Sequence, residues 1–427
     1  MNHDSDTSRD HALSILGQDS PDPWGRPEPG PSTLMVAVGG EHAPSTEWIR
    51  DVLGAQSENE DAIVELDQEL DGPPFALWSM VLSFGSHPVP VVVWSEQVTE
   101  PDSLPPLASG GRWMIGIQTV LDPESPLAMW NRMACLLVRC SPEVLCLFDQ
   151  ETEQWFAPDE IARYLLGSVP MTHEGMLFRV HATATSERPE EADSIWLHTQ
   201  GLHRCGCPEL ELLELPAKHL GVAHEMLEAL GALFINHGVP DPGVRFEAGT
   251  GVALVLDEWK RSVEFLGEHS VGGLEHRMQP GAVDENPLTT GRAVVCGPDP
   301  VGSFRKVLVW PQAAIAGLEA GTAALERTPA WTASRASVAR SLWPRFLELH
   351  AQGRTMLACV SVESGPENRE HIWIEVSQAT ATSLLGHVTS NAGSGTHQAG
   401  DSVSLDDLDS LIDWYSPEDE SIPRGDA

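Results

Sequence analysis

Basic residues are scarce in this chain. Its 427 residues include 25 Lys and Arg against 63 Asp and Glu, which gives a formal net charge of -38. A negative field of this size repels phosphate backbones, so nucleic acid is not an expected partner. The same field keeps a protein soluble, and it would also steer a basic protein toward the surface. Among macromolecules, the composition therefore favours a protein partner.

Long apolar runs are also missing. No run approaches the roughly 18 residues that a membrane span needs, and the first residues, Met1 to Asp6, are polar and acidic. The seven Cys residues are an odd number spread through a long chain, which argues against a disulfide framework. We therefore expect reduced thiols, a cytoplasmic location and no membrane insertion.

Short catalytic signatures are absent as well. The sequence contains no Gly-x-x-x-x-Gly-Lys phosphate loop, no Gly-x-Ser-x-Gly elbow and no His-Glu-x-x-His pair, each of which carries a defined chemistry. No cofactor is expected from motifs, and the chain is expected not to be an enzyme.

The length predicts two or three domains, because one hydrophobic core rarely serves so many residues. Alternating strand and helix patterns predict an α+β class: a mixed α/β N-terminal and central region, followed by a small C-terminal module with a sheet. The expected parts are a disordered arm at 1–32, an N-terminal α/β domain at 33–170, a central α+β domain at 171–328, a C-terminal module at 334–416 and an acidic tail at 417–427. Trp24 is the only aromatic residue of the arm, and we expect it to be untethered.

Several segments are predicted from hydrophobic periodicity and from the Gly and Pro residues that bound them. Apolar residues from Leu220 to Phe234 recur at steps of three and four, the strongest helix pattern in the chain. Further predictions are helices at 45–53, 127–139, 158–166, 311–326 and 334–351, a strand at 305–310, a long loop at 260–303 and a linker at 327–330.

One stretch between two expected strands gathers six reactive side chains: His198, His203, Cys205, Cys207, Glu209 and Glu211. Thiolate and imidazole suit zinc, although paired Cys ligands usually stand two to four residues apart. The first hypothesis is therefore zinc at His198, His203, Cys205 and Cys207, either in a metal-stabilised domain or in a metal-dependent hydrolase. A second hypothesis uses a His as base, Cys205 as nucleophile and Glu209 to orient the imidazole.

A structural interpretation of the same stretch is favoured over both. His198 would alternate with its neighbours on a strand, and Gly201 would turn the chain. The carboxylates of Glu209, Glu211 and Glu214 would then form a solvated face, and the Cys residues would be small core residues.

The C-terminal module resembles the YegJ-like bacterial domain of unknown function. The resemblance is carried by Glu370-His371-x-Trp373-x-Glu375-Val376, Gly386, Asn391, Gly400-Asp401-x-Val403 and Ile412-Asp413-Trp414. The sequence departs from that pattern at Ala358-Cys359-Val360, where the family has a basic residue. The central run is similar to a segment of larger uncharacterised bacterial proteins that carry this module. Some relatives of such modules are immunity proteins, so the resemblance implies a regulatory or immunity-like role.

The module also offers candidate contact residues. Strand alternation places His371, Trp373 and Glu375 on one face and Ile372 on the other, and we expect His371 to pack beside Trp373. Asp413 and Trp414 are further candidates, since aromatic anchors dominate protein interfaces. The sequence therefore predicts a non-enzymatic, acidic interaction protein.

Overall fold

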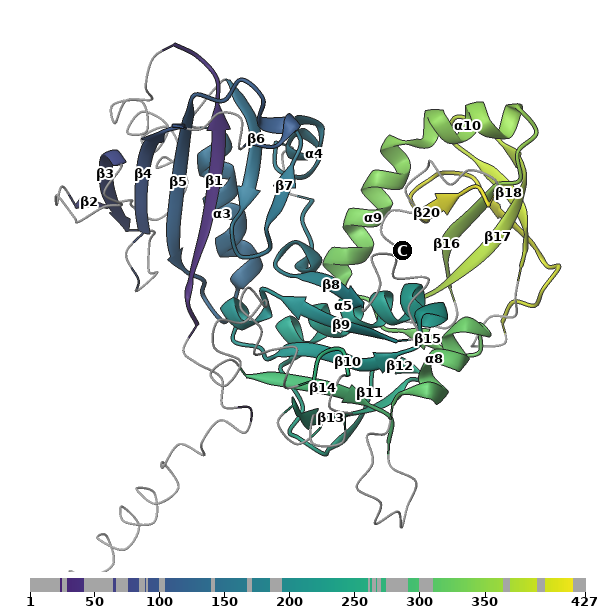
Figure 1. Ribbon diagram of the computed structural model, residues 1–427. Coiled ribbons are helices and arrows are strands. Elements are labelled where there is room, and N and C mark those ends of the chain that lie inside the picture. Colours follow the sequence, from purple (N-terminus) through teal and green to yellow (C-terminus); the bar gives the residue numbers. More distant parts are fainter. Residues whose placement is uncertain are drawn as a thin grey trace, which may run out of the picture.

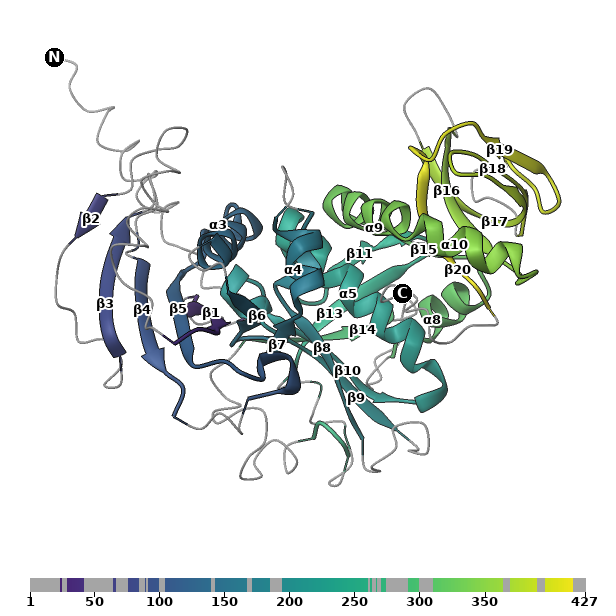
Figure 2. The ribbon, with the colours of Figure 1, turned by 90° about the horizontal axis from the view of Figure 1, so that it is seen from above.

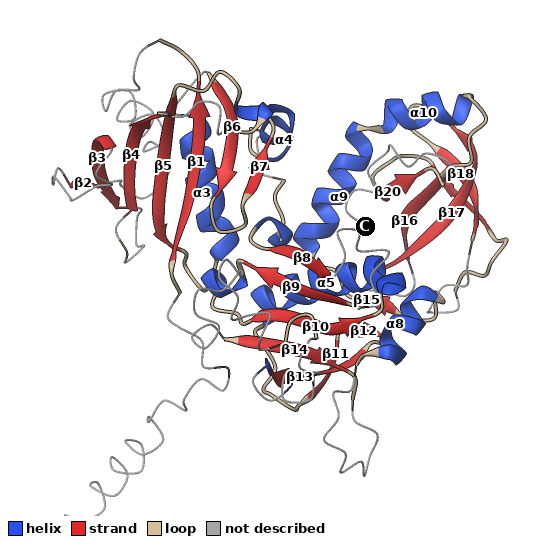
Figure 3. Cartoon of the chain, in the orientation of Figure 1, coloured by secondary structure: helices blue, strands red, loops and turns tan. Residues whose placement is uncertain are grey.

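The computed structural model of the chain contains three β-sheets of five or more strands with helices packed on them, which confirms the α+β class (Figures 1 and 3). Among the residues that the structure describes, no helix has the length and apolar character needed to span a lipid bilayer. The described residues are 24, 29–41, 64–66, 76–83, 89, 91–99, 104–139, 143–166, 171–184, 194–259, 262, 266, 270–273, 291–298, 310–363, 369–389 and 396–417.

The first sheet is antiparallel and has seven strands. Its elements are β1 (Pro31–Val38), β2 (Val64–Leu66), β3 (Ala76–Ser83), β4 (Val91–Gln97), β5 (Trp113–Val120), β6 (Val144–Asp149) and β7 (Gln154–Phe156), with helices α3 (Pro126–Arg139) and α4 (Pro158–Tyr164). The strand order is β2-β3-β4-β5-β1-β6-β7. On one face of β1, Leu34 and Val36 pack with Trp130 of α3, whereas Ala37 packs with Ala108 in a separate cluster. Both faces of β1, an inner strand of this sheet, are therefore buried.

The second sheet has six strands and is mixed. Its elements are β8 (Arg179–Ala184), β9 (Ile195–Gln200), β10 (Glu209–Leu215), β11 (Arg245–Glu247), β13 (Ala253–Glu258) and β14 (Arg292–Cys296), with α5 (Leu220–His237) and α8 (Gln312–Glu319). The order is β11-β13-β14-β10-β9-β8, in which β10 and β14 are parallel. Helix α5 packs Leu227 and Leu230 on one face, and Trp196 and Trp259 form a cluster on the other. A short pair, β12 (Gly249–Thr250) with β15 (Ala324–Leu325), lies beside this sheet.

The third sheet has five antiparallel strands. Its elements are β16 (Leu357–Glu363), β17 (Arg369–Ala379), β18 (Leu384–Val388), β19 (Ser402–Leu405) and β20 (Leu411–Tyr415), with α9 (Pro329–Ser341) and α10 (Trp343–Ala351). Ile372 and Ile374 of β17 pack with Phe346 of α10 on one face of the sheet. The other face of β17 carries His371, Trp373 and Glu375, as the alternation predicts.

The first and third sheets lie on opposite sides of the second, which spans the space between them (Figures 1 and 2). Two residues near strands of the second sheet belong to the core of the first sheet. They are Leu177, which precedes β8, and Cys205, which follows β9. Ile235 of α5 packs against the cores of both sheets. These contacts cross the expected boundary between residues 33–170 and 171–328, and the division into domains stays a prediction.

Two residues in regions that the sequence assigned to irregular structure are buried. Trp24 was expected to be untethered, but it is buried in the core of the second sheet. The linker expected at 327–330 instead begins α9, because the Thr328 hydroxyl accepts a hydrogen bond from the Trp331 amide and Thr328 is itself buried.

The region between α5 and α9 also differs from its prediction. The segment expected as a loop at 260–303 contains β14, all five residues of which are buried in the sheet. The helix expected at 311–326 ends at Glu319, because Gly321 turns the chain with φ +66° before β15. The helix expected at 45–53, the strand at 305–309, Asn391 and most of the terminal arm and tail lie outside the described residues.

Candidate functional site

The central stretch forms a tight turn between β9 and β10. Gly201 has φ +113°, and a Cβ there would lie 2.6 Å from the Leu177 carbonyl oxygen, so glycine is required. A short 3-10 helix follows from Leu202 to Cys205 and ends at Gly206. The prediction that Gly201 turns the chain is confirmed.

The turn directs Arg204 into the protein interior. Its Nη1 and Nη2 donate to the two carboxylate oxygens of Asp149 at 2.9 and 2.8 Å, and Nε donates to the Leu177 carbonyl at 2.9 Å. Trp130 Nε1 also donates to Asp149 at 2.8 Å. Neither Arg204 nor Asp149 is exposed, so this pair fastens the turn to β6 of the first sheet. Arg204 was not predicted as a functional or structural residue, since neither spacing nor periodicity distinguishes an Arg in this turn.

Glu209 accepts four hydrogen bonds in the same turn. Its Oε1 accepts from the amides of Gly201 and His203 at 2.9 and 3.1 Å and lies 2.7 Å from His203 Nδ1, while Oε2 accepts from the Thr199 hydroxyl at 2.7 Å. Glu151 lies 3.5 Å from the other ring nitrogen of His203. The imidazole therefore sits between two carboxylates.

These contacts move two pKa values apart. Burial alone would raise the pKa of Glu209, but hydrogen bonds from His203 and Thr199 and the charge of His203 lower it to about 2. Burial alone would lower the pKa of His203, but Glu151 and Glu209 outweigh it and raise the value to about 9. At neutral pH the pair is an imidazolium and a carboxylate.

The predicted solvated face of glutamates is wrong for two of its three members. Glu209 and Glu211 are buried and only Glu214 is exposed. Glu211 pairs with Arg292 of β14 at 2.8 Å, and Glu209 is held as described above. Burial is tolerated because each carboxylate meets a cation or several donors.

His198 is a core histidine. It lies on β9, as predicted, and its ring stacks at 4.2 Å from Trp196 and 5.5 Å from His181. Burial is the main cause that lowers its pKa to about 3, so the ring is neutral at physiological pH.

The four residues of the zinc hypothesis point into different surroundings. Cys205 packs in the core of the first sheet and Cys207 in that of the second, while His203 is engaged by Glu151 and Glu209. Burial raises the pKa of the Cys205 thiol, which opposes a nucleophilic thiolate. Across the described part of the chain, no group of three or more His, Cys, Asp or Glu is placed to hold a metal ion. The zinc and nucleophile hypotheses stay predictions from the sequence, without geometry that supports them.

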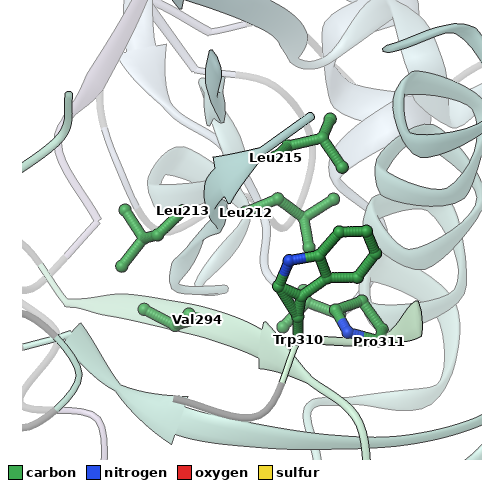
Figure 4. A pocket seen from close by; sticks show the side chains of 7 residues that line it. Leu212, Leu213, Leu215, Val294, Trp310 and Pro311 are labelled. Carbon is green, nitrogen blue, oxygen red and sulfur yellow. The ribbon is translucent and has the colours of Figure 1, made fainter. Parts of the chain in front are cut away.

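A small gap lies behind this stretch, between β10, β14 and the start of α8 (Figure 4). Its volume is about 10 Å³, and its lining includes Leu212, Leu215 and Trp310. Space for about one water molecule between apolar walls does not form a ligand site.

A much larger cavity of about 370 Å³ lies where α5 and α9 face the third sheet, and we call it the C-terminal cavity. Three of the candidate residues, His371, Trp373 and Asp413, line it. Trp414 does not, because its indole points into the core and donates to the Ala339 carbonyl at 3.0 Å. His371 is exposed and Trp373 is half-buried, and both line the cavity from the same face of β17. The whole lining is Glu225, Leu325, Arg327, Trp331, Arg335, Cys359, His371, Trp373, Ile412, Asp413 and Tyr415.

Guanidinium groups and aromatic rings dominate this cavity. The Cζ atoms of Arg327 and Arg335 lie 4.6 and 5.2 Å from the centre of the Trp331 ring. On the opposite wall, Trp373 and Tyr415 meet edge to face with centroids 5.1 Å apart. Arg327, Trp331 and Arg335 were not predicted as site residues, although their spacing of four residues suits one helical face, because the first turn of α9 was taken as a linker.

Two carboxylates accompany the guanidiniums. Arg335 forms a close hydrogen-bonded pair with Asp413, and Arg327 lies 3.6 Å from Glu225. Burial raises the pKa of Asp413 against the opposing effect of Arg335. Burial also lowers the pKa of Arg327. The wall further contains Cys359, whose pKa burial raises to about 12, so the cavity offers binding groups and no reactive thiolate.

The comparisons with known proteins concern the second sheet. The family model described as "Protein of unknown function (DUF4026) C-terminal" matches residues 180–288. This part of the chain is similar to that domain and includes the central turn. No curated protein and no solved structure matches the chain. The matched residues lie outside 334–416, so the YegJ-like assignment of the C-terminal module stays a resemblance.

Proposed function

We propose that this protein is a non-enzymatic interaction protein, with a regulatory or immunity-like role, that receives a group of its partner in the C-terminal cavity. The observation that carries the proposal is the lining of that cavity: three half-buried aromatic rings beside two guanidiniums. Aromatic and Arg side chains in pockets are the typical energetic anchors of interfaces. A volume of about 370 Å³ lies within the range of cavities that bind ligands.

The charge of the chain supports a macromolecular partner. The net charge of -38 would accelerate the encounter with a positively charged protein, while the cavity would fix the orientation after contact. The central turn between β9 and β10, by contrast, has a structural role in this proposal, because its charged groups bind one another inside the fold.

The test places a photo-crosslinking residue at the cavity. His371→p-benzoylphenylalanine changes an exposed side chain of the lining, and the full chain would be irradiated in its own cells. The matched control is Arg345→p-benzoylphenylalanine on α10, an exposed residue of the helix packed on the other face of the same sheet. A protein adduct formed from position 371 and absent from position 345 is the expected result. Irradiation that yields equal adducts, or none, at the two positions would refute the proposal.

A further inference from the structure

The two guanidiniums of the C-terminal cavity are unequally neutralised. Arg335 is held by Asp413 in a close hydrogen-bonded pair. Arg327 has, among the described residues, one ion pair at 3.6 Å with Glu225, whose side chain is 35% exposed. That separation is too long for a good hydrogen bond. Arg327 therefore keeps N–H donors for another acceptor.

The place of Arg327 makes those donors costly to leave unused. Its side chain is only 16% exposed, so its charge is poorly solvated, and this burial lowers the pKa of the group. The Trp331 ring holds the guanidinium on one side at 4.6 Å. An anionic group entering the cavity would restore the lost solvation through charge-assisted hydrogen bonds.

The walls around Arg327 limit what can accompany that anion. Trp373 and Tyr415 present half-buried rings on the opposite side, where a flat apolar group can pack. A volume of about 370 Å³ lies near the lower end of the range for small-ligand pockets, which suits a single ring with a short attached chain. Glu225 and Asp413 also line the cavity and would repel a doubly charged phosphate more strongly than a monoanion.

We propose that the C-terminal cavity binds a carboxylate joined to an aromatic ring, either directly or through a short chain, with the carboxylate on Arg327 and the ring against Trp373 and Tyr415. This inference rests on the proposed function and names the group that the cavity receives. Such a group can belong to a free aromatic acid or to the C-terminal residue of a polypeptide.

The test uses three probes of one shape on the full-length protein: benzoate, benzamide and benzamidine. They carry a negative, a zero and a positive charge, and binding is followed by saturation-transfer NMR with titration. Benzoate is expected to bind most tightly and benzamidine least. Arg327→Gln should weaken benzoate by about tenfold or more, the size expected for loss of a charge-assisted hydrogen bond, and Arg345→Gln on α10 should leave it unchanged.

Two further variants keep the test valid if Arg327→Gln misfolds, and two further ligands distinguish the possible sources of the carboxylate. Arg327→Lys keeps the charge, and Trp373→Leu removes the ring contact, so each should weaken benzoate even if Arg327→Gln misfolds. N-acetylphenylalanine and its C-terminal amide distinguish the sources, because tighter binding of this acid than of benzoate favours a chain end. A preference for benzamidine, equal binding of all three probes, or binding of none of them would overturn this ligand class. A specific crosslink from position 371 would still uphold the proposed function.

Discussion

Arg204 and Asp149 form an ion pair in which neither side chain is exposed. Removing one partner of such a pair leaves an uncompensated buried charge, which costs about 3–5 kcal/mol. We therefore expect Arg204→Met to lower the free energy of unfolding by about that amount. The change is measured by urea denaturation, with tryptophan fluorescence and circular dichroism followed in parallel because several cores are present.

Two controls separate the buried charge from the loss of an Arg side chain. Arg345→Met breaks a pair with Glu348 at 3.0 Å in which both side chains are exposed, and it should change stability by less than about 0.5 kcal/mol. The double variant Arg204→Met with Asp149→Leu removes both charges and should be more stable than the single variant. If the double variant is as unstable as the sum of its single changes, the charge argument fails.

His203 gives the protein a pH dependence of known sign. Its pKa is raised from 6.5 to about 9, so its contribution is complete below pH 6.5 and is lost as the pH rises to about 9. Glu209 acts in the acid range: with its pKa lowered from 4.5 to about 2, its contribution is complete above pH 4.5 and is lost toward pH 2. In the alkaline window we expect stability to fall by up to about 3 kcal/mol from His203, at about 1.4 kcal/mol per pKa unit.

His203→Gln tests that assignment. The variant lacks the titrating ring, so its unfolding free energy should vary less than that of the wild type between pH 6.5 and pH 9. His350→Gln on α10, far from the turn in the chain, serves as the matched change of a His. Parallel pH profiles for the wild type and His203→Gln would contradict a charged His203.

At the level of elements, Thr328 connects α9 to the second sheet region. Its hydroxyl accepts from the Trp331 amide at 3.1 Å and donates to Glu174 at 2.7 Å. Loss of an N-cap costs about 0.5–2 kcal/mol, so Thr328→Val should destabilise the start of α9. Hydrogen exchange of peptides covering 329–335 should become faster, whereas Thr328→Ser, which keeps the hydroxyl, should exchange like the wild type. Unchanged exchange in Thr328→Val would show that the cap is dispensable.

The elements show which sequence signals are sufficient. Helices α3 and α5 were predicted because Trp130, Met133 and Leu137, or Leu227 and Leu230, follow one helical face. Strand β14 was missed because its five buried residues stand alone between polar and Gly-rich segments, and only pairing with β10 and β13 makes them a strand. A periodic pattern can be recognised only over enough residues, and a five-residue strand that is buried on both faces shows no alternation.

The lining of the C-terminal cavity was predicted only in part, because it is assembled from several segments of the chain. His371, Trp373 and Asp413 were candidates within the C-terminal module and do line the cavity. Glu225 comes from a segment far away in the sequence, and Arg327 from the stretch that was taken as a linker. Only the docking of α5 and α9 against the third sheet brings both residues to the cavity. The central stretch misled in the opposite direction, since residues close in sequence, such as Cys205 and Cys207, pack into different cores.

At the scale of the whole molecule, a net charge of -38 opposes the compact state through self-repulsion. Raising the salt concentration from ~0.01 M to ~0.1 M shortens the Debye length from ~30 Å to ~10 Å, which screens surface charges and leaves buried pairs less affected. We expect the thermal midpoint to rise by a few degrees, since about 1 kcal/mol corresponds to about 2–4 °C in a large domain. NaCl and KCl at equal ionic strength should act alike if screening is the cause, while sucrose at equal osmolality controls for excluded-solute effects. A midpoint that falls with salt would mean that attractive surface pairs outweigh the repulsion.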